Sequence, residues 1–185
     1  FLEVVIANGF DSNALKILKK KKNLRLIDAT NLIIENIIRF NSANDFILSQ
    51  SEDLEKFNIK NFKIVSKKKP TKSQLKNLIF AFNVCRYVKS NAIVLACKEA
   101  TVGIGSGQPS RLDSCQIAID KMNKFQNLSD EVVAASDAFF PFVDGLEKLV
   151  QSGVTAVIQP SGSIRDKEII KFANQTNTVL IFSKT

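Results

Sequence analysis

Three short segments combine glycine, polar, charged and aromatic residues at points where apolar runs end. The first, residues 89–111, leads from an apolar stretch into Gly-Ser-Gly-Gln-Pro-Ser-Arg. The second is SDAFFPFVDG at residues 136–145, and the third is QPSGSIR at residues 159–165. Each lies where a strand is expected to give way to a loop or a helix, so backbone amides, hydroxyls and carboxylates are available to a ligand. The three segments therefore predict a ligand pocket.

The glycines of the first segment allow two interpretations. Without side chains, Gly103, Gly105 and Gly107 let a ligand or another chain segment approach the backbone closely. A dinucleotide-binding fingerprint requires G-x-G-x-x-G, whereas this chain has G-x-G-x-G followed by Gln-Pro-Ser-Arg. A tight strand-to-helix turn is the simpler interpretation. A dinucleotide-binding α/β enzyme that uses residues 103–107 is the alternative hypothesis.

Arg111 is the unusual residue at the end of this segment. Pro109 and Ser110 indicate that a helix begins here, with Ser110 as its cap. A cation in the first helical turn faces the positive end of the helix dipole, and this costs stability unless an anion offsets it. Arg111 is therefore either an anion-binding residue or a simple surface residue.

The second and third segments have similar pairs of interpretations. Asp137 and Asp144 bracket a Phe-Phe-Pro-Phe run, whose rings belong either to the core, with Asp144 as a helix cap, or to the walls of a heteroaromatic site. The residues 161–163 either cap the next helix or leave its free amides for an anion. The chain contains no histidine and no serine in a nucleophile-elbow setting, so an obvious proton-transfer group is missing.

Composition limits the class of protein. With 185 residues, 45% of them hydrophobic and 24% charged, the chain is expected to be one ordinary domain. No apolar run is long enough for a membrane span and no leader precedes the first strand, so we expect a cytoplasmic protein. Three widely spaced cysteines without histidine predict buried thiols and no zinc site: Cys85, Cys97 and Cys115.

The net charge of +8 comes largely from lysine runs at residues 19–22 and 67–69. The five arginines are scattered, so base-reading forks are not apparent and nucleic-acid binding is disfavoured. A basic, non-catalytic binding module is the third hypothesis, and steeply salt-dependent binding to nucleic acid would be its signature. Attraction of a small anionic substrate is the milder consequence of the charge.

The elements that must position these segments follow from periodicity, except at residues 29–61, which are left unassigned. Strands are expected at residues 1–7, 24–27, 62–65, 92–96, 101–104, 132–135, 155–158 and 178–182, and helices at residues 12–22, 71–88, 110–125, 144–152 and 165–175. The alternation predicts an α/β fold, layered α/β/α, with a mostly parallel or mixed sheet. In such sheets ligands bind beyond the carboxyl ends of the strands, where the three segments are expected.

The chain resembles the carboxyl-terminal, formyl-transferring part of the bifunctional AICAR transformylase and IMP cyclohydrolase family. The resemblance is carried by these segments: FLEVVIA, ALKILKKKKNLRL, VKSNAIVLA, TVGIGSGQPSRLDS, AASDAFFPFVDGLE and GVTAVIQPSGSIRDKEII. It is poorest at residues 29–61. The resemblance implies a cytidine-deaminase-like fold without its zinc, and formyl transfer from 10-formyltetrahydrofolate to AICAR, giving FAICAR in purine biosynthesis.

The same resemblance implies that residues 1–185 are a fragment. The cyclohydrolase domain is absent, and the family's catalytic Lys-His pair and its closing Arg-x-Phe-x-His lie outside the chain. We therefore expect the isolated fragment to be inactive, because the amine of AICAR is a poor nucleophile that needs a proton acceptor. Full-length family members are homodimers with sites at the subunit interface, and neither a membrane nor a nucleic acid is expected as a partner.

Site residues follow from the resemblance, position by position. The catalytic residues would be Asn91, which orients the amine, and Asp144, which binds the pterin. AICAR would be bound by Arg111, Phe139, Gly105 and Gln108, and the folate by Asp144, Pro141, Ser161, Gly162 and Ser163. A monovalent cation, potassium in the family, would lie near Asp137, Ser90 and Val88, although Ala92 stands where a hydroxyl ligand could be.

Overall fold

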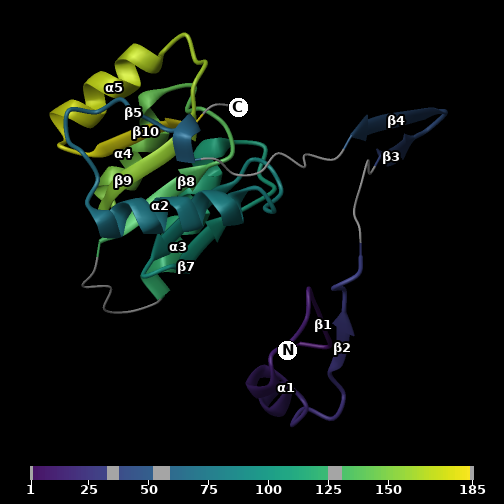
Figure 1. Ribbon diagram of the computed structural model, residues 1–185. Coiled ribbons are helices and arrows are strands. Elements are labelled where there is room, and N and C mark those ends of the chain that lie inside the picture. Colours follow the sequence, from purple (N-terminus) through teal and green to yellow (C-terminus); the bar gives the residue numbers. More distant parts are fainter. Residues whose placement is uncertain (1, 33–37, 52–58, 125–130, 184–185) are drawn as a thin grey trace. The chain divides into compact units, whose positions relative to one another are not determined.

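The computed structural model describes residues 2–32, 38–51, 59–124 and 131–183 (Figure 1). The chain divides into two compact units, residues 1–55 and residues 56–185. The sequence led us to expect one ordinary domain, because its composition does not change near residue 55.

The first unit contains a short β-α-β arrangement. The strands β1 (Val4–Ala7) and β2 (Arg25–Asp28) pair in parallel, and α1 (Ser12–Leu18) connects them. Asp11 caps α1, because its carboxylate accepts hydrogen bonds from the N–H groups of Asn13 and Ala14, both at 2.8 Å. The helix ends before the lysine run at residues 19–22, where like charges one turn apart disfavour its continuation.

A hairpin occupies part of the stretch that the periodicity left unassigned. The strands β3 (Ile38–Ala43) and β4 (Phe46–Ser51) pair antiparallel, and every residue in them is exposed. Asn44 has a φ of 52°, which the tight turn between the two strands requires. Apolar and polar side chains occur on both faces of this hairpin, so neither a helical period nor a clean alternation is present.

The second unit is built on a six-stranded sheet of order β5-β10-β9-β8-β6-β7. Its strands are β5 (Lys63–Ile64), β6 (Ile93–Cys97), β7 (Ala100–Gly105), β8 (Val132–Ser136), β9 (Val154–Pro160) and β10 (Val179–Ser183). The strands β8, β9 and β10 are parallel, whereas β5, β6 and β7 join antiparallel. The sheet is therefore mixed.

The antiparallel pairing of β6 with β7 has a local cause. Only Lys98 and Glu99 connect the two strands, and both have positive φ, at 51° and 54°. A parallel pair would need a crossover of about a dozen residues, so a connection this short enforces a hairpin.

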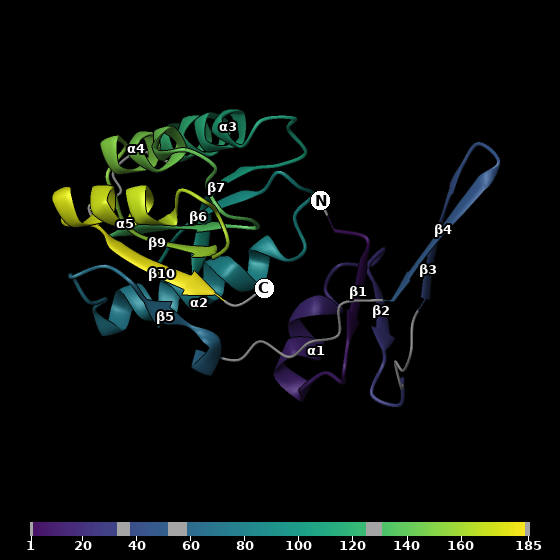
Figure 2. The same ribbon diagram turned by 90° about the horizontal axis from the view of Figure 1, so that it is seen from above.

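Helices cover both faces of the sheet (Figure 2). The helix α2 (Lys72–Cys85) covers one face, where its Leu78 belongs to a buried cluster with Val94 and Ile158. The other face carries α3 (Arg111–Lys124), α4 (Val143–Gln151) and α5 (Asp166–Gln175). The α/β class is confirmed. A single-turn 3-10 helix (Ile59–Asn61) precedes β5.

The start of α2 agrees with the helix predicted over residues 71–88, and a capping box fixes it. The Thr71 hydroxyl accepts a hydrogen bond from the Gln74 N–H, and the Gln74 side chain accepts one from the Thr71 N–H, each at 3.0 Å. The Gln74 amide also donates to the Thr155 hydroxyl at 3.0 Å. Both ends of this fully buried amide are therefore paired.

Two glycines of the first segment serve the packing of α3 against β7. A Cβ on Gly103 would lie 2.0 Å from the Ala118 carbonyl oxygen, and one on Gly105 would lie 1.9 Å from the Ser114 carbonyl oxygen. The chain segment that approaches these glycines is therefore α3. The dinucleotide hypothesis thereby loses the feature that suggested it.

Candidate functional site

The three segments meet at one edge of the six-stranded sheet. The strands β8 and β9 run in the same direction and end at Ser136 and Pro160. Because β6 is antiparallel to β8, its first residue Ile93 lies at the same edge, opposite Ser136. The predicted convergence of the segments at the carboxyl ends of the strands is therefore present.

Arg111 joins the first segment to the second. Its guanidinium donates to the Asn91 side-chain oxygen at 2.8 Å, to the Ser136 hydroxyl at 3.0 Å and to the Asp137 carboxylate. The Arg111 and Asp137 side chains are only 11% and 15% exposed, so this is a largely buried ion pair. Arg111 is thus not a surface residue. The anion that offsets its position in the first turn of α3 is a carboxylate of the same chain.

Asp137 is held ionised by its surroundings. Its two oxygens accept hydrogen bonds from the Ser90 hydroxyl, the Ala92 N–H and Arg111. Burial by itself would raise the pKa of Asp137, but these hydrogen bonds and the charge of Arg111 outweigh it and lower the pKa below its ordinary value. The carboxylate is therefore a fixed negative charge at this edge of the sheet.

Asn91 is fixed at all of its polar groups. Its side-chain nitrogen donates to the carbonyl oxygens of Gln108 and Pro109, at 2.8 and 3.1 Å. Its backbone oxygen accepts a hydrogen bond from the buried Ser114 hydroxyl at 2.8 Å. With Arg111 on its side-chain oxygen, Asn91 has a defined orientation in which its N–H groups face the glycine turn.

The glycine turn closes over residues 89–91. Gly107, with a φ of 68°, donates its N–H to the Lys89 carbonyl oxygen at 2.8 Å. The Gln108 side chain donates back to the Ser106 carbonyl oxygen at 3.0 Å. Gln108 therefore contacts Asn91 through its backbone carbonyl oxygen. Gly105, which the resemblance assigned to the substrate site, is buried against α3.

Two contacts join the second segment to the third. The Gln159 side-chain oxygen accepts a hydrogen bond from the Phe140 N–H at 3.4 Å. The Arg165 guanidinium lies over the Phe142 ring, 4.6 Å from its centroid. Of the three phenylalanines, Phe140 is core, at 1% exposure, while Phe139 and Phe142 are 38% and 51% exposed. The run therefore provides both core and accessible rings.

Asp144 lies on the exposed side of this segment. The cap of α4 is Phe142, with no side-chain cap hydrogen bond, so the interpretation of Asp144 as the helix cap is wrong. Asp144 is in the first turn, and its carboxylate accepts a hydrogen bond from the Gly145 N–H at 2.7 Å. A negative charge is favourable there because it faces the positive end of the helix dipole.

Two residues of the loop 161–163 form hydrogen bonds with the start of α5. The Ser163 hydroxyl accepts a hydrogen bond from the Arg165 N–H at 3.1 Å, and Gly162 donates its N–H to the Asp166 carboxylate at 2.9 Å. The cap of α5 is Arg165, not one of the serines. Ser161 is exposed, and its N–H donates to the Ser183 carbonyl oxygen at 3.4 Å.

Comparison of the sequence with known proteins identifies the family of this chain. A family model described as AICARFT/IMPCHase bienzyme matches residues 1–121. The chain belongs to this family. It is 43% identical over 191 residues to the bifunctional purine biosynthesis protein PurH of Buchnera aphidicola subsp. Schizaphis graminum, covering 100% of this chain and 35% of that protein.

Other relatives agree with this assignment to the AICARFT/IMPCHase family. The chain is 44% identical to PurH of Leuconostoc mesenteroides, over 100% of this chain and 36% of that protein. It is 42% identical to PurH of Ligilactobacillus salivarius, over 99% of this chain and 36% of that protein. The chain thus spans about a third of the length of the curated relatives it matches.

Some contacts of this candidate site were not predicted from the sequence. The buried hydroxyls of Ser114 and Ser136 hold Asn91 and Arg111, and Gln159 holds Phe140. For Gln159 a signal exists, because it is the polar residue that ends the apolar run AVI at residues 156–158. The two serines carry no comparable signal.

Within the described residues, the possible metal ligands do not gather in one place and the three cysteines are buried. Within residues 2–32, 38–51, 59–124 and 131–183, no group of three His, Cys, Asp or Glu side chains is placed to hold a metal ion. All three cysteines are buried and unbridged, as expected. Burial raises the pKa of both Cys85 and Cys115 to about 12, so these thiols are poor nucleophiles.

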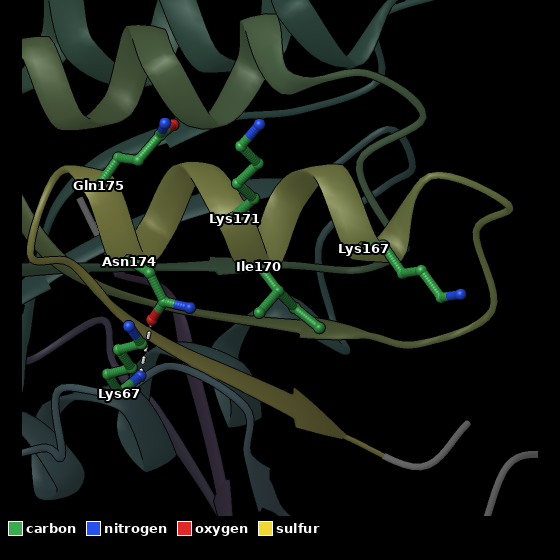
Figure 3. A pocket seen from close by; sticks show the side chains of 6 residues that line it. All are labelled: Lys67, Lys167, Ile170, Lys171, Asn174 and Gln175. Atoms are coloured by element: carbon green, nitrogen blue, oxygen red, sulfur yellow. Dashed lines mark hydrogen bonds between the residues drawn. The ribbon is translucent and has the colours of Figure 1, made fainter.

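A separate hollow of about 430 Å³ lies beside α5 and contains no residue of the three segments. It is lined by Lys67, Lys167, Ile170, Lys171, Asn174 and Gln175 (Figure 3). The three lysine ammonium groups point in different directions, so they do not converge on one ligand atom. The Asn174 side-chain oxygen already accepts a hydrogen bond from the Lys67 backbone N–H at 2.7 Å.

None of the described helices is long and apolar enough to cross a membrane.

Proposed function

We propose that this chain is the carboxyl-terminal part of the transformylase domain of a bifunctional enzyme. The enzyme would transfer the formyl group of 10-formyltetrahydrofolate to the 5-amino group of AICAR, and a second domain would close the ring of FAICAR to IMP. The observation that carries the proposal is the hydrogen-bonded meeting of the three segments at one sheet edge, in a chain of the AICARFT/IMPCHase family.

In the proposed reaction the first segment would orient the amine of AICAR, and the second and third segments would bind the folate. The amine nitrogen attacks the formyl carbon, the bond from that carbon to the folate nitrogen breaks, and the amine proton moves to the departing nitrogen. Asn91 would orient the amine by accepting a hydrogen bond from one of its N–H groups on the second lone pair of the side-chain oxygen, which Arg111 and the glycine turn hold in place. Arg111 would act on the substrate mainly through Asn91, since its own guanidinium is held by Asp137.

The folate would lie along the second and third segments. Asp144, Pro141 and Ser161 are exposed, and the accessible Phe139 ring of the second segment would supply a flat apolar surface. A carboxylate beside aromatic walls suits a heterocycle that presents N–H groups. Gly162 and Ser163 would shape this pocket rather than bind an anion, because their polar groups already serve α5.

Other features of the family also belong to the proposal. We propose the cytidine-deaminase-like layering, a homodimer and a cytoplasmic location for the full-length protein. The Asp137 carboxylate already accepts three hydrogen-bond donors beside a guanidinium, so it is a poor ligand for a potassium ion. A cation there would have to be held by backbone carbonyl oxygens, and no step of the reaction is assigned to it.

The 185-residue chain alone is proposed to be inactive. It contains no histidine, and Asp137 is an ionised, fully hydrogen-bonded carboxylate. A weakly nucleophilic amine without a positioned proton acceptor should react several orders of magnitude more slowly. Formyl transfer by the purified 185-residue chain would contradict this part of the proposal.

The test is formyl transfer from 10-formyltetrahydrofolate to AICAR by the full-length protein that contains this chain. We expect Asn91→Ala to lower kcat on the order of a hundredfold or more, because a positioned polar group is lost. Asp144→Ala should mainly raise the KM for the folate. The matched control is Glu147→Ala, an exposed carboxylate on the same helix, which should retain activity.

The outcomes separate the hypotheses. A lowered kcat in Asn91→Ala and a raised folate KM in Asp144→Ala, with folding intact and the control active, would support the proposal. An inactive wild-type protein that is stabilised against heat by NADH but not by folate analogues would favour the dinucleotide alternative. Steeply salt-dependent binding to nucleic acid without formyl transfer would favour the basic binding module.

A further inference from the structure

Three buried side-chain atoms lack a hydrogen-bond partner within the described ranges, and their residues lie at the end of β9, at the end of β10 and at the start of α5. They are Gln159 Nε2, Asp166 Oδ1 and Ser183 Oγ. Gln159 lies near the end of β9, Ser183 ends β10, and Asp166 begins α5. Since buried polar groups are normally paired, such exceptions near the sheet edge that carries the candidate site call for an explanation, and Gln159 most of all, because it contacts that site.

Among these three residues, Gln159 is the one that contacts the candidate site. Its side chain is fully buried and lies on the face of the sheet covered by α3, α4 and α5, as its alternation with Ile158 requires. Its oxygen accepts the Phe140 N–H at 3.4 Å, which is long for such a bond. The amide is therefore loosely engaged at one end and unpaired at the other.

Phe140 transmits this contact to the exposed wall of the pocket. Its ring is fixed against α4, because a Cβ on Gly145 would lie 2.7 Å from it. Its neighbours in the chain, Phe139 and Pro141, are both exposed. The Gln159 side chain cannot touch a ligand itself, since it has no accessible surface. Any influence on binding must pass through the Phe140 backbone.

We propose that Gln159 is a positioning residue for the folate pocket, a role that rests on the proposed function. Its side-chain oxygen sets the Phe140 backbone and thereby the exposed Phe139 and Pro141. The bond of 3.4 Å should shorten when the folate binds, as hydrogen bonds at active sites commonly do. An amide that served stability alone would be paired at both ends.

Gln74 supplies the matched control for this role. It is also fully buried, but both ends of its amide are paired, and it lies on α2 against the opposite face of the sheet. Methionine has nearly the same shape as glutamine and lacks its strong hydrogen-bonding groups. The variants Gln159→Met and Gln74→Met therefore remove one loosely bonded amide and one firmly bonded amide.

The experiment measures two quantities in the full-length protein: the dissociation constant for tetrahydrofolate by calorimetry, and the urea midpoint of unfolding. We expect Gln159→Met to weaken tetrahydrofolate binding by about fivefold, the effect of one neutral hydrogen bond, with a small change in midpoint. Gln74→Met should lower the midpoint more and leave the dissociation constant unchanged. Unchanged binding in Gln159→Met would overturn the inference.

A second measurement uses the wild-type protein alone and does not depend on a folded variant. Amide hydrogen exchange at Phe140 should slow when tetrahydrofolate is added, because the bond to Gln159 shortens. Equal exchange rates with and without bound tetrahydrofolate would overturn the inference. Absence of tetrahydrofolate binding by the wild type would instead overturn the proposed function, and this inference with it.

Discussion

At the scale of single residues, the site is organised by the charge of Arg111. This residue begins α3, where a cation is unfavourable by itself, and Asp137 supplies the compensating charge from the end of β8. The same guanidinium holds the Asn91 side chain and the Ser136 hydroxyl. Residues just before β6 and at the end of β8 therefore depend on one side chain of α3 for their relative positions.

Arg111→Met should destabilise the protein by about 2 kcal/mol or more, because it leaves the Asp137 carboxylate buried without its partner. Arg165→Met is the control. It removes an ion pair to Glu168 whose side chains are 48% and 57% exposed, and the expected cost is about 1 kcal/mol or less. Urea unfolding at pH 7 measures both, and equal effects would contradict the central role of Arg111.

The lowered pKa of Asp137 predicts a pH dependence with a definite sign. A carboxylate whose pKa is lower in the folded state stabilises the fold above its ordinary pKa of 3.8 and loses this effect as the pH falls through the lower folded value. We expect wild type to be more stable than Asp137→Asn at pH 7. The difference should shrink below pH 3.8. Unfolding midpoints that differ equally at every pH would contradict this.

At the scale of elements, the contact between α3 and β7 sets where Arg111 stands. Gly103 and Gly105 let the helix backbone lie directly on the strand. The Ser114 hydroxyl then reaches the Asn91 backbone oxygen from the first turns of the same helix. The glycines thus contribute to the site by allowing close packing, although they need not touch a ligand.

Gly105→Ala should cost about 3 kcal/mol or more, because its Cβ would overlap the Ser114 carbonyl oxygen and displace α3. Gly107→Ala is the matched control in the same turn. Its Cβ would lie 3.7 Å from the Lys89 side chain, so only the φ of 68° opposes it, at about 1 kcal/mol. Thermal unfolding measures both changes, and an equal loss would show that packing against α3 is not limiting.

At the scale of the whole molecule, the two units differ in how much they bury. In the described part of the first unit only Ala29 is buried, at 9% exposure, while Phe40, Phe46 and Ile47 are 67%, 73% and 72% exposed. In the second unit every residue of β6, β8 and β10 is buried. The stability of the 185-residue chain must therefore reside in the second unit.

This difference predicts the pattern of amide hydrogen exchange in the 185-residue chain. Amides of β6, β8 and β9 should exchange slowest, through global unfolding, because their strands lie in the core between helices. Amides of β1 and β2 should exchange much faster, since local opening exposes little additional apolar surface. Equal protection in the two units would contradict this assignment.

Much of the element order could be predicted from local signals. The Thr71 capping box starts α2, Asp11 caps α1, and the apolar runs that became β6, β8 and β10 were recognised as strands. The hairpin β3-β4 was missed, because both of its faces mix apolar and polar residues. Whether Asn91, Asp144 and the other implied residues act on a substrate stays a prediction.

By itself the sequence determined what depends on neighbours along the chain: which runs are strands or helices, where caps and turns lie, and that polar segments follow buried strands. Only the tertiary structure decided that the sheet is mixed, that α3 rather than a ligand lies on Gly103 and Gly105, and that Arg111 pairs with Asp137, 26 residues away. Propensity and capping act over a few residues, whereas these contacts depend on strand order and direction, which are set by packing through space.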